Sequence, residues 1–300
     1  VRLGAEVLRT STAGVVAVAA VVGGVAMLGS GGNDGTPSVA NDVSTPPATT
    51  TRVETWRDVS VTVPASWSHG NLDDWCGDGG SYQGSQPVVE RPGAISIDIL
   101  CHPKYGYGVQ FSEAPASGFE AFGPGTVNES VGDDYPDGSW QGWDQVGTTR
   151  ALVVAPTQAE AEQVLGSFAQ FKGADANGCS AHPDREQPAV AAGVVRLCRY
   201  AGDGWLDQSE ILTADDAREA TQALDAAPDR PALACPNLVG SSVVVTSADQ
   251  TGVVQLETCA GLFGWGGVQH DLTADILYWV LSPGWSGQIP DGITMKGLRP

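Results

Sequence analysis

The stretch ALVVAPTQAEAEQVLGSFAQF at residues 151–171 changes its periodicity partway along and decides the fold class. Its first five residues are apolar and predict a buried strand over 151–155. Thr157 and Glu160 then have the spacing of a capping box. The apolar side chains that follow recur at helical intervals on one face: Ala161, Val164, Leu165 and Phe168. The pattern predicts a helix over 157–171 that covers an antiparallel sheet, so the expected fold class is α+β.

The residues before this stretch predict the rest of that sheet. Val59, Val61 and Val63 alternate with polar residues and indicate a strand with one face against a core, which Pro64 ends. Loops rich in Gly and Asp separate further strand candidates at 94–101, 108–111 and 140–146.

A second sheet-and-helix unit is expected after residue 173. Thr213 is expected to cap its helix, with Asp215 and Asp216 in the first turn, where the helix dipole favours negative charge. The apolar stripe of this helix consists of Ala217, Ala220, Ala223 and Leu224, and Pro228 stops it. The other expected elements are strands at 193–200 and 205–212, a hairpin of 241–247 with 252–258, and a terminal helix at 272–281.

The apolar run AGVVAVAAVVGGVAML at residues 13–28 predicts where the chain resides. At about 1.5 Å per residue it covers roughly 24 Å, a little short of a hydrocarbon core of about 30 Å, and flanking small residues close that gap. Arg2 and Arg9 precede it, so the positive-inside rule places the N-terminus in the cytoplasm and the rest outside. We expect a transmembrane helix over 13–29; a cleaved secretory signal and a buried globular helix are the alternatives.

The chain is accordingly divided into six parts. They are a cytoplasmic tail (1–12), the transmembrane helix (13–29), a flexible linker rich in Gly, Ser, Thr and Pro (30–52), two extracytoplasmic α+β domains (53–172 and 173–282) and a tail (283–300).

Cysteine usage supports export, because all six cysteines follow the apolar run. An even count there predicts three disulfides. The cysteines are Cys76, Cys101, Cys179, Cys198, Cys235 and Cys259. If the chain divides near residue 173, the first two have only each other, while the other four allow three pairings. We favour sequential pairs within that set, Cys179 with Cys198 and Cys235 with Cys259, since each spacing suits two adjacent strands joined by a loop.

Charge and motif content exclude several function classes. The net charge of −20 and the scarcity of lysine argue against nucleic-acid binding and against docking onto anionic lipid. The cysteine and histidine spacings do not fit zinc, and the acidic runs do not fit an EF-hand loop. No phosphate-binding loop occurs, and we expect neither a metal nor a cofactor.

No catalytic signature occurs either, and a Gly-x-Ser-x-Gly elbow is absent. The histidines (His69, His102, His182 and His270) stand alone beside Gly or Pro and are interpreted as solvated loop residues. Paired carboxylates for glycoside cleavage could be drawn from Glu113, Glu129, Asp133, Asp134 or Asp137, although coincidence explains such sets in an acidic chain. Trp140 and Trp143 could form a platform for a sugar ring, but strand alternation would send them to opposite faces. Trp205, Trp265 and Trp279 are expected in the core.

Several of these segments together carry a resemblance to known proteins. VSVTVPASW, LVVAPTQAEAEQVLGSF, CRYAGDGWLDQSEILTADDAREATQALDAAP and the hairpin ending in Cys259 resemble a group of actinobacterial proteins with one N-terminal span and a disulfide-bearing extracytoplasmic region. That resemblance implies topology and disulfide bonding, and it implies no activity. The first-domain strand and capped helix are also similar to PsbP-like α+β folds, which commonly serve as binding or assembly factors.

These observations favour a membrane-anchored, non-enzymatic extracytoplasmic protein that binds an unknown envelope partner. The alternative function is an extracytoplasmic cell-wall hydrolase or transferase, and the alternative location is secretion after signal cleavage.

Overall fold

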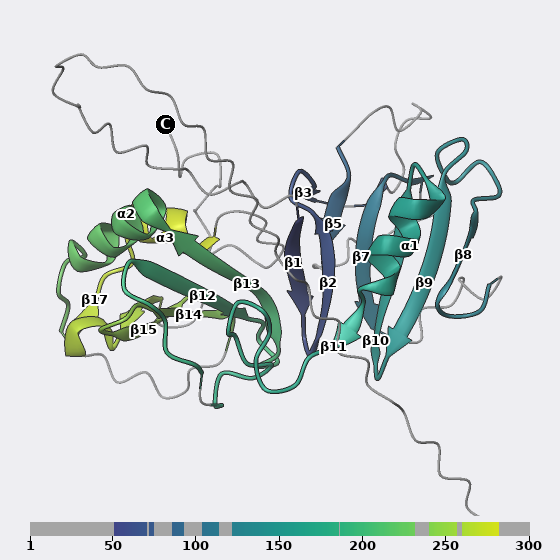
Figure 1. Ribbon diagram of the computed structural model, residues 1–300. Helices are drawn as coiled ribbons and strands as arrows, with labels where there is room; N and C mark the ends of the chain where they lie inside the picture. The colour runs from purple at the N-terminus through teal and green to yellow at the C-terminus, as the bar shows by residue number, and fades with distance from the viewer. Residues whose placement is uncertain are drawn as a thin grey trace, which may run out of the picture. The chain divides into compact units, whose positions relative to one another are not determined.

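The computed structural model describes residues 51–70, 72–74, 86–92, 104–113, 122–185, 187–231, 240–256 and 260–281 (Figure 1). They belong to one compact unit that spans residues 48–300. The described residues form four sheets and three α-helices, which confirms the mixed α+β fold class. The predicted boundary between domains at residue 173 stays a prediction.

The described chain begins with an antiparallel hairpin. Strand β1 (Thr51–Trp56) pairs with β2 (Val59–Pro64), and the short β11 (Ala169–Gln170) extends this sheet on the β2 side. Burial alternates along β2 as the valine pattern predicted, so one of its faces lies against the core. Arg57, in the turn, has φ of 57°, a left-handed conformation that non-glycine residues seldom adopt.

A six-stranded sheet follows, in the order β3-β5-β7-β10-β9-β8. Its strands are β3 (Ser68–His69), β5 (Val88–Glu90), β7 (Gly108–Glu113), β10 (Thr149–Ala155), β9 (Trp140–Val146) and β8 (Thr126–Glu129). The expected antiparallel sheet is wrong in part, because β5 runs parallel to both β3 and β7. Two further short strands, β4 (Asp73–Asp74) and β6 (Lys104–Tyr105), form a pair of their own.

The capped helix α1 (Gln158–Gly166) lies across this sheet, as predicted (Figure 1). The Thr157 side chain accepts a hydrogen bond from the Glu160 N–H at 3.3 Å, which satisfies one free donor of the first turn. The helix ends at Gly166, earlier than the expected residue 171. Ser167 closes it, because its hydroxyl bonds the Val164 carbonyl at 2.6 Å while the chain turns into β11.

A second six-stranded sheet is antiparallel throughout, in the order β13-β12-β14-β15-β16-β17. Its strands are β12 (Val194–Tyr200), β13 (Leu206–Thr213), β14 (Ser242–Thr246), β15 (Thr251–Gln255), β16 (Gly261–Phe263) and β17 (Gln269–His270). Strands β14 and β15 form the predicted hairpin. The 3-10 turn η1 (Trp265–Gly267) precedes β17.

Two helices cover one face of this second sheet (Figure 1). Helix α2 (Ala214–Asp225) buries Ala217, Ala220 and Leu224 of the predicted stripe, and α3 (Ala274–Leu281) packs against it. Thr213 occupies the N-cap position, but its side chain makes no capping hydrogen bond. Helix α2 also ends before Pro228 is reached.

A β-bulge interrupts the pairing of β12 with β13. Arg199 lies opposite Gln208, whereas the next residue, Tyr200, lies opposite Leu206, so Asp207 is the extra residue of β13. A bulge of this kind re-aims side chains.

The predicted transmembrane helix, linker and C-terminal tail lie outside the described residues, apart from the first two positions of β1. So does the expected strand at 94–101. None of the described helices has the length and apolar composition of a membrane span.

Candidate functional site

The predicted disulfide between Cys179 and Cys198 is present, with the two Cα atoms 5.5 Å apart. It joins the loop before β12 to the middle of that strand, and both residues are fully buried beside Tyr200, Leu206 and Val244. The other four cysteines, Cys76, Cys101, Cys235 and Cys259, lie outside the described residues, so their pairings stay predictions.

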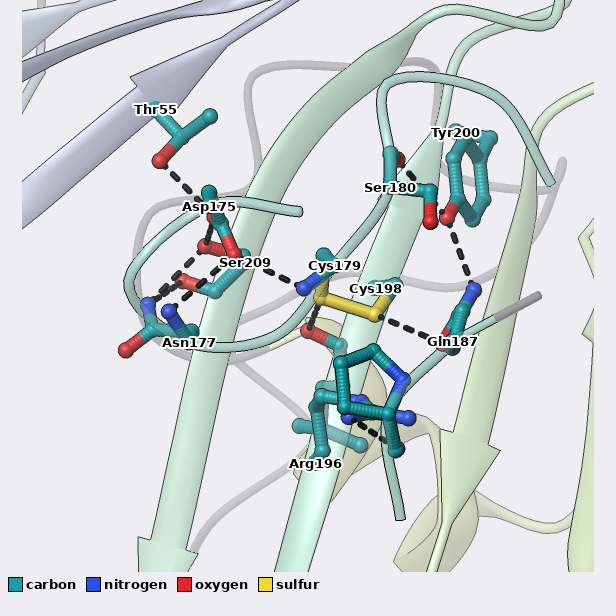
Figure 2. The surroundings of a disulfide bond; sticks show 12 residues. Thr55, Asp175, Asn177, Cys179, Ser180, Gln187, Arg196, Cys198, Tyr200 and Ser209 are labelled. Carbon is teal, nitrogen blue, oxygen red and sulfur yellow. Dashed lines mark hydrogen bonds between the residues drawn. A yellow bond between two sulfur atoms is a disulfide. The ribbon is translucent and has the colours of Figure 1, made fainter. Parts of the chain in front are cut away.

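The loop that carries Cys179 is organised by a buried carboxylate (Figure 2). Asp175 accepts hydrogen bonds from the backbone N–H groups of Cys179 at 2.7 Å and Asn177 at 3.0 Å. Its second oxygen accepts from the Thr55 hydroxyl of β1 at 2.9 Å and from the Ser209 hydroxyl of β13. One side chain therefore ties the disulfide loop to two strands far apart in the sequence.

A second set of polar contacts connects β1 with β13. The guanidinium of Arg91 donates to Glu54 Oε2 at 2.6 Å, and its Nε donates to the carbonyls of Thr55 at 3.2 Å and Asp207 at 2.8 Å. Glu54 also bonds Arg52 and the His69 ring nitrogen. The side chains of Arg91 and Glu54 are 1% and 4% exposed, so this is a buried ion pair.

Burial and charge oppose each other at Glu54. Burial alone raises the pKa of a carboxyl, but Arg91, His69 and Arg52 outweigh it and hold the pKa of Glu54 well below its usual range. Glu54 is therefore ionised at neutral pH.

At Glu210, in the bulged edge strand β13 of the second sheet, burial outweighs the effect of the nearby positive charge. Burial raises the pKa of Glu210 to about 7, although Arg199 opposes the shift. The nearest Arg199 nitrogen lies 3.9 Å from Glu210 Oε2, too far for a hydrogen bond. Arg199 instead donates to Val280 O and to Gln208 Oε1, each at 2.6 Å. Burial likewise raises the pKa of Asp207.

The histidine interpretation was wrong for two of the four residues. His270 is buried in β17, with its ring nitrogens 3.0 Å from the carbonyls of Ala227 and Trp265. His69 is in β3 and bonds the buried Glu54. His182 is half-buried, and His102 lies outside the described residues.

The paired-tryptophan platform is also not formed. Trp140 packs against the cluster below α1, whereas Trp143 belongs to the cluster of Leu72 and Val154. The Trp143 indole also donates to the Phe122 carbonyl at 3.0 Å. The two rings thus lie on opposite faces of β9, as strand alternation predicted. Trp265 is fully buried, and Trp279 packs against the same core. The expectation was wrong for Trp205, which is only partly buried and lines a pocket.

Two pockets of the described surface could hold a ligand. The larger, about 510 Å³, lies between β8 and α1. Its lining is Gly125, Thr126, Val127, Asp144, Glu162, Leu165, Gly166 and Phe168. The lining thus includes two carboxylates, Asp144 and Glu162, beside the apolar side chains of Val127, Leu165 and Phe168. The carboxylates considered from the sequence do not line it, and Glu113 is paired with Arg57 instead.

The smaller pocket, about 360 Å³, is formed by the turn after β1, the end of β11 and the loop that follows Cys179. We call it the cationic pocket. Its lining is Asp58, Gln170, Phe171, Lys172, Gly173, Ala181, His182, Arg185 and Trp205. Sequence reasoning missed it, because its cationic residues are scattered and no motif connects them.

Within the described ranges, no group of three or more His, Cys, Asp or Glu side chains could hold a metal ion. No family model matches the chain, and no curated protein or solved structure shows significant similarity to it. The resemblances inferred from the sequence therefore stay predictions.

Proposed function

We propose that this chain is a single-span membrane protein whose larger part lies outside the cytoplasm and acts as a non-enzymatic binding module of the cell envelope. The observation that carries the proposal is the buried disulfide between Cys179 and Cys198. Disulfides persist in oxidising compartments and are rare in the cytosol. The apolar run at 13–28 supplies the anchor in this proposal.

The binding part of the proposal is supported by a pocket that lies beside strands held together by buried hydrogen bonds. The hydrogen bonds of Asp175 and Arg91 tie β1 to β13, and the cationic pocket opens beside that junction, at the turn after β1. Ligand sites typically occupy such preformed clefts between packed elements.

Reporter fusions at the C-terminus of the full chain test the location. We expect an alkaline phosphatase fusion to be active, because that enzyme needs export and oxidation, and a green fluorescent protein fusion exported by the same route to be dark. A fluorescent fusion with an inactive phosphatase would place the C-terminal part in the cytosol and refute the extracytoplasmic proposal. Capture of one reproducible partner from envelope extract by the detergent-solubilised full chain tests the binding role.

A cell-wall hydrolase or transferase is the second candidate, favoured by Asp144 and Glu162 in one pocket of about 510 Å³. Glycoside cleavage uses two carboxyl groups that flank the scissile bond. If this candidate is correct, the purified chain degrades peptidoglycan, and the variants Asp144→Asn and Glu162→Gln each abolish that turnover. Turnover that survives both substitutions would exclude this pocket as its source.

A further inference from the structure

The cationic pocket is lined by positively charged side chains that have no partner, whereas the other described cations have one. The sequence has 35 acidic residues against 15 lysines and arginines. Most described cations are paired, as Arg57 is with Glu113 and Asp203. Of the lysine and arginine side chains that the structure describes, Lys172 and Arg185 alone have no ion pair, hydrogen bond or ring contact, and both line this pocket.

A third lining residue, the His182 ring, is held so that one of its nitrogens stays available. Its Nδ1 lies 3.0 Å from the Gly204 carbonyl, and because a carbonyl only accepts, Nδ1 carries the proton. The ring packs against Trp205 with the ring centroids 4.0 Å apart. Nε2 has no partner among the described residues, and in this tautomer it is an acceptor that can receive a hydrogen bond from a hydroxyl group of a ligand.

The one carboxylate in the lining is already engaged. Asp58 accepts a hydrogen bond from the Gln170 amide at 2.6 Å. The walls are also braced by backbone bonds, since the Phe171 N–H donates to Asp58 O at 3.0 Å and the Leu206 N–H to Ala181 O at 2.9 Å. The neutral amide leaves the charge of Asp58 in place, so Lys172 and Arg185 against Asp58 give the lining a net charge of +1 on a preformed frame.

We propose that the cationic pocket binds a small organic molecule through an oxyanion group, a carboxylate or a phosphate, held by Lys172 and Arg185, while His182 Nε2 accepts a hydrogen bond from a hydroxyl of the same molecule. The volume of about 360 Å³ is at the small end of the range for ligand sites, which suits a single sugar acid or sugar phosphate. Lys and Arg are the side chains that pair with carboxylate and phosphate groups. This inference names a ligand class for the proposed binding module and rests on that proposal.

Isothermal titration calorimetry of the full chain in mild detergent tests it, with three probes: glucuronate, glucose 6-phosphate and neutral glucose. Binding of glucuronate alone identifies a carboxylate ligand, binding of glucose 6-phosphate alone a phosphate ligand, and binding of both a general oxyanion site. Each of these results supports the proposal, provided that glucose does not bind. Equal binding of all three probes, or of none up to tens of millimolar, overturns it.

The variant that assigns binding to this pocket is Lys172→Gln combined with Arg185→Gln. Both side chains are exposed, so the substitutions leave the fold intact. We expect affinity to fall by about fivefold or more, and added salt to weaken binding to the wild-type chain. The matched control is Arg218→Gln, an exposed cation on α2 outside the pocket. If the control weakens binding as much as the double variant does, the pocket assignment is wrong.

The two proposals can fail separately. A reproducible envelope partner together with silent titrations removes the oxyanion pocket and leaves the binding module. A cytosolic C-terminus removes the envelope role, whatever the titrations show.

Discussion

Replacing Arg91 by methionine tests whether the buried ion pair holds the junction of β1 and β13. Methionine keeps much of the apolar stem but removes every donor that Arg91 gives to Glu54 and to the carbonyls of Thr55 and Asp207. Glu54, only 4% exposed, would then lose its strongest charge partner while it remained buried.

The size of the expected destabilisation follows from the Glu54 charge, which stays buried when Arg91 is removed. Breaking a buried pair by removal of one partner destabilises a protein by about 3–5 kcal/mol, because the remaining charge stays desolvated. Glu54 keeps Arg52 and His69, which places the loss at the lower end of that range. We therefore expect Arg91→Met to lower the free energy of unfolding by about 3 kcal/mol. Arg91→Lys keeps the positive charge but loses several of the directed hydrogen bonds, so its free energy of unfolding should lie between those of the wild-type chain and Arg91→Met.

Urea unfolding of the full chain in mild detergent, followed by tryptophan fluorescence, measures these differences. Arg218→Met is the matched control: its arginine is 58% exposed and pairs with Asp215 on the surface, so a loss below about 1 kcal/mol is expected. A loss for Arg91→Met no larger than that of the control would refute the reasoning that this pair holds the junction.

Three further predictions concern other parts of the described structure. Because burial raises the pKa of Glu210 from 4.5 to about 7, the folded chain keeps this proton where the unfolded chain has lost it, so stability falls as pH rises through that window. Urea unfolding at a series of pH values measures this fall, of which Glu210→Gln should remove up to about 3 kcal/mol. The exposed control Glu219→Gln should leave it unchanged. If the two variants show the same dependence of stability on pH, Glu210 is not the group responsible. The double variant Cys179→Ala with Cys198→Ala, which opens a loop with a sequence separation of 19, should lose about 3 kcal/mol in thermal unfolding, and an unchanged midpoint would show that the bond does not stabilise the chain. In Gly108→Ala the new methyl carbon would overlap the backbone carbonyl oxygen of Val88 in β5, so the parallel pairing must shift, with a loss of about 3 kcal/mol or more. Wild-type stability of this variant would contradict the close approach of the two strands.

Patterns of apolar and polar residues predicted helices and strands well where one face of the element packs against a core. The valine alternation of 59–63 became the alternating burial of β2, and the expected strand at 140–146 coincides with β9. The spacing of Phe168 extended the predicted helix too far, because a buried ring four residues after Val164 fits a helix. In the structure that ring reaches the core after the chain has left α1.

The junction and the cationic pocket could not be predicted from patterns. Glu54 and Arg91 are 37 positions apart, and a single long-range ion pair leaves no periodic trace in a sequence. The parallel pairing of β5 could not be predicted either, because the sequence of a three-residue strand does not show whether it will pair in a parallel or an antiparallel direction. His270 looked solvated because of its loop-like surroundings, whereas backbone carbonyls in space supply its partners.

The hairpin at the start of the described chain has a mechanical consequence. Thr51 lies opposite Pro64, at the open end of the β1–β2 ladder, so tension applied through the preceding residues loads that ladder one pair at a time. Side-chain contacts outside the ladder begin at its second pair, where Arg52 donates to the carbonyls of Ala65 and Trp67. They continue at Glu54 and Thr55, which contact His69 of β3, Arg91, and Asp175 of the disulfide loop. A chain pulled from its N-terminal side would thus meet contacts with several other segments within the first five residues of β1.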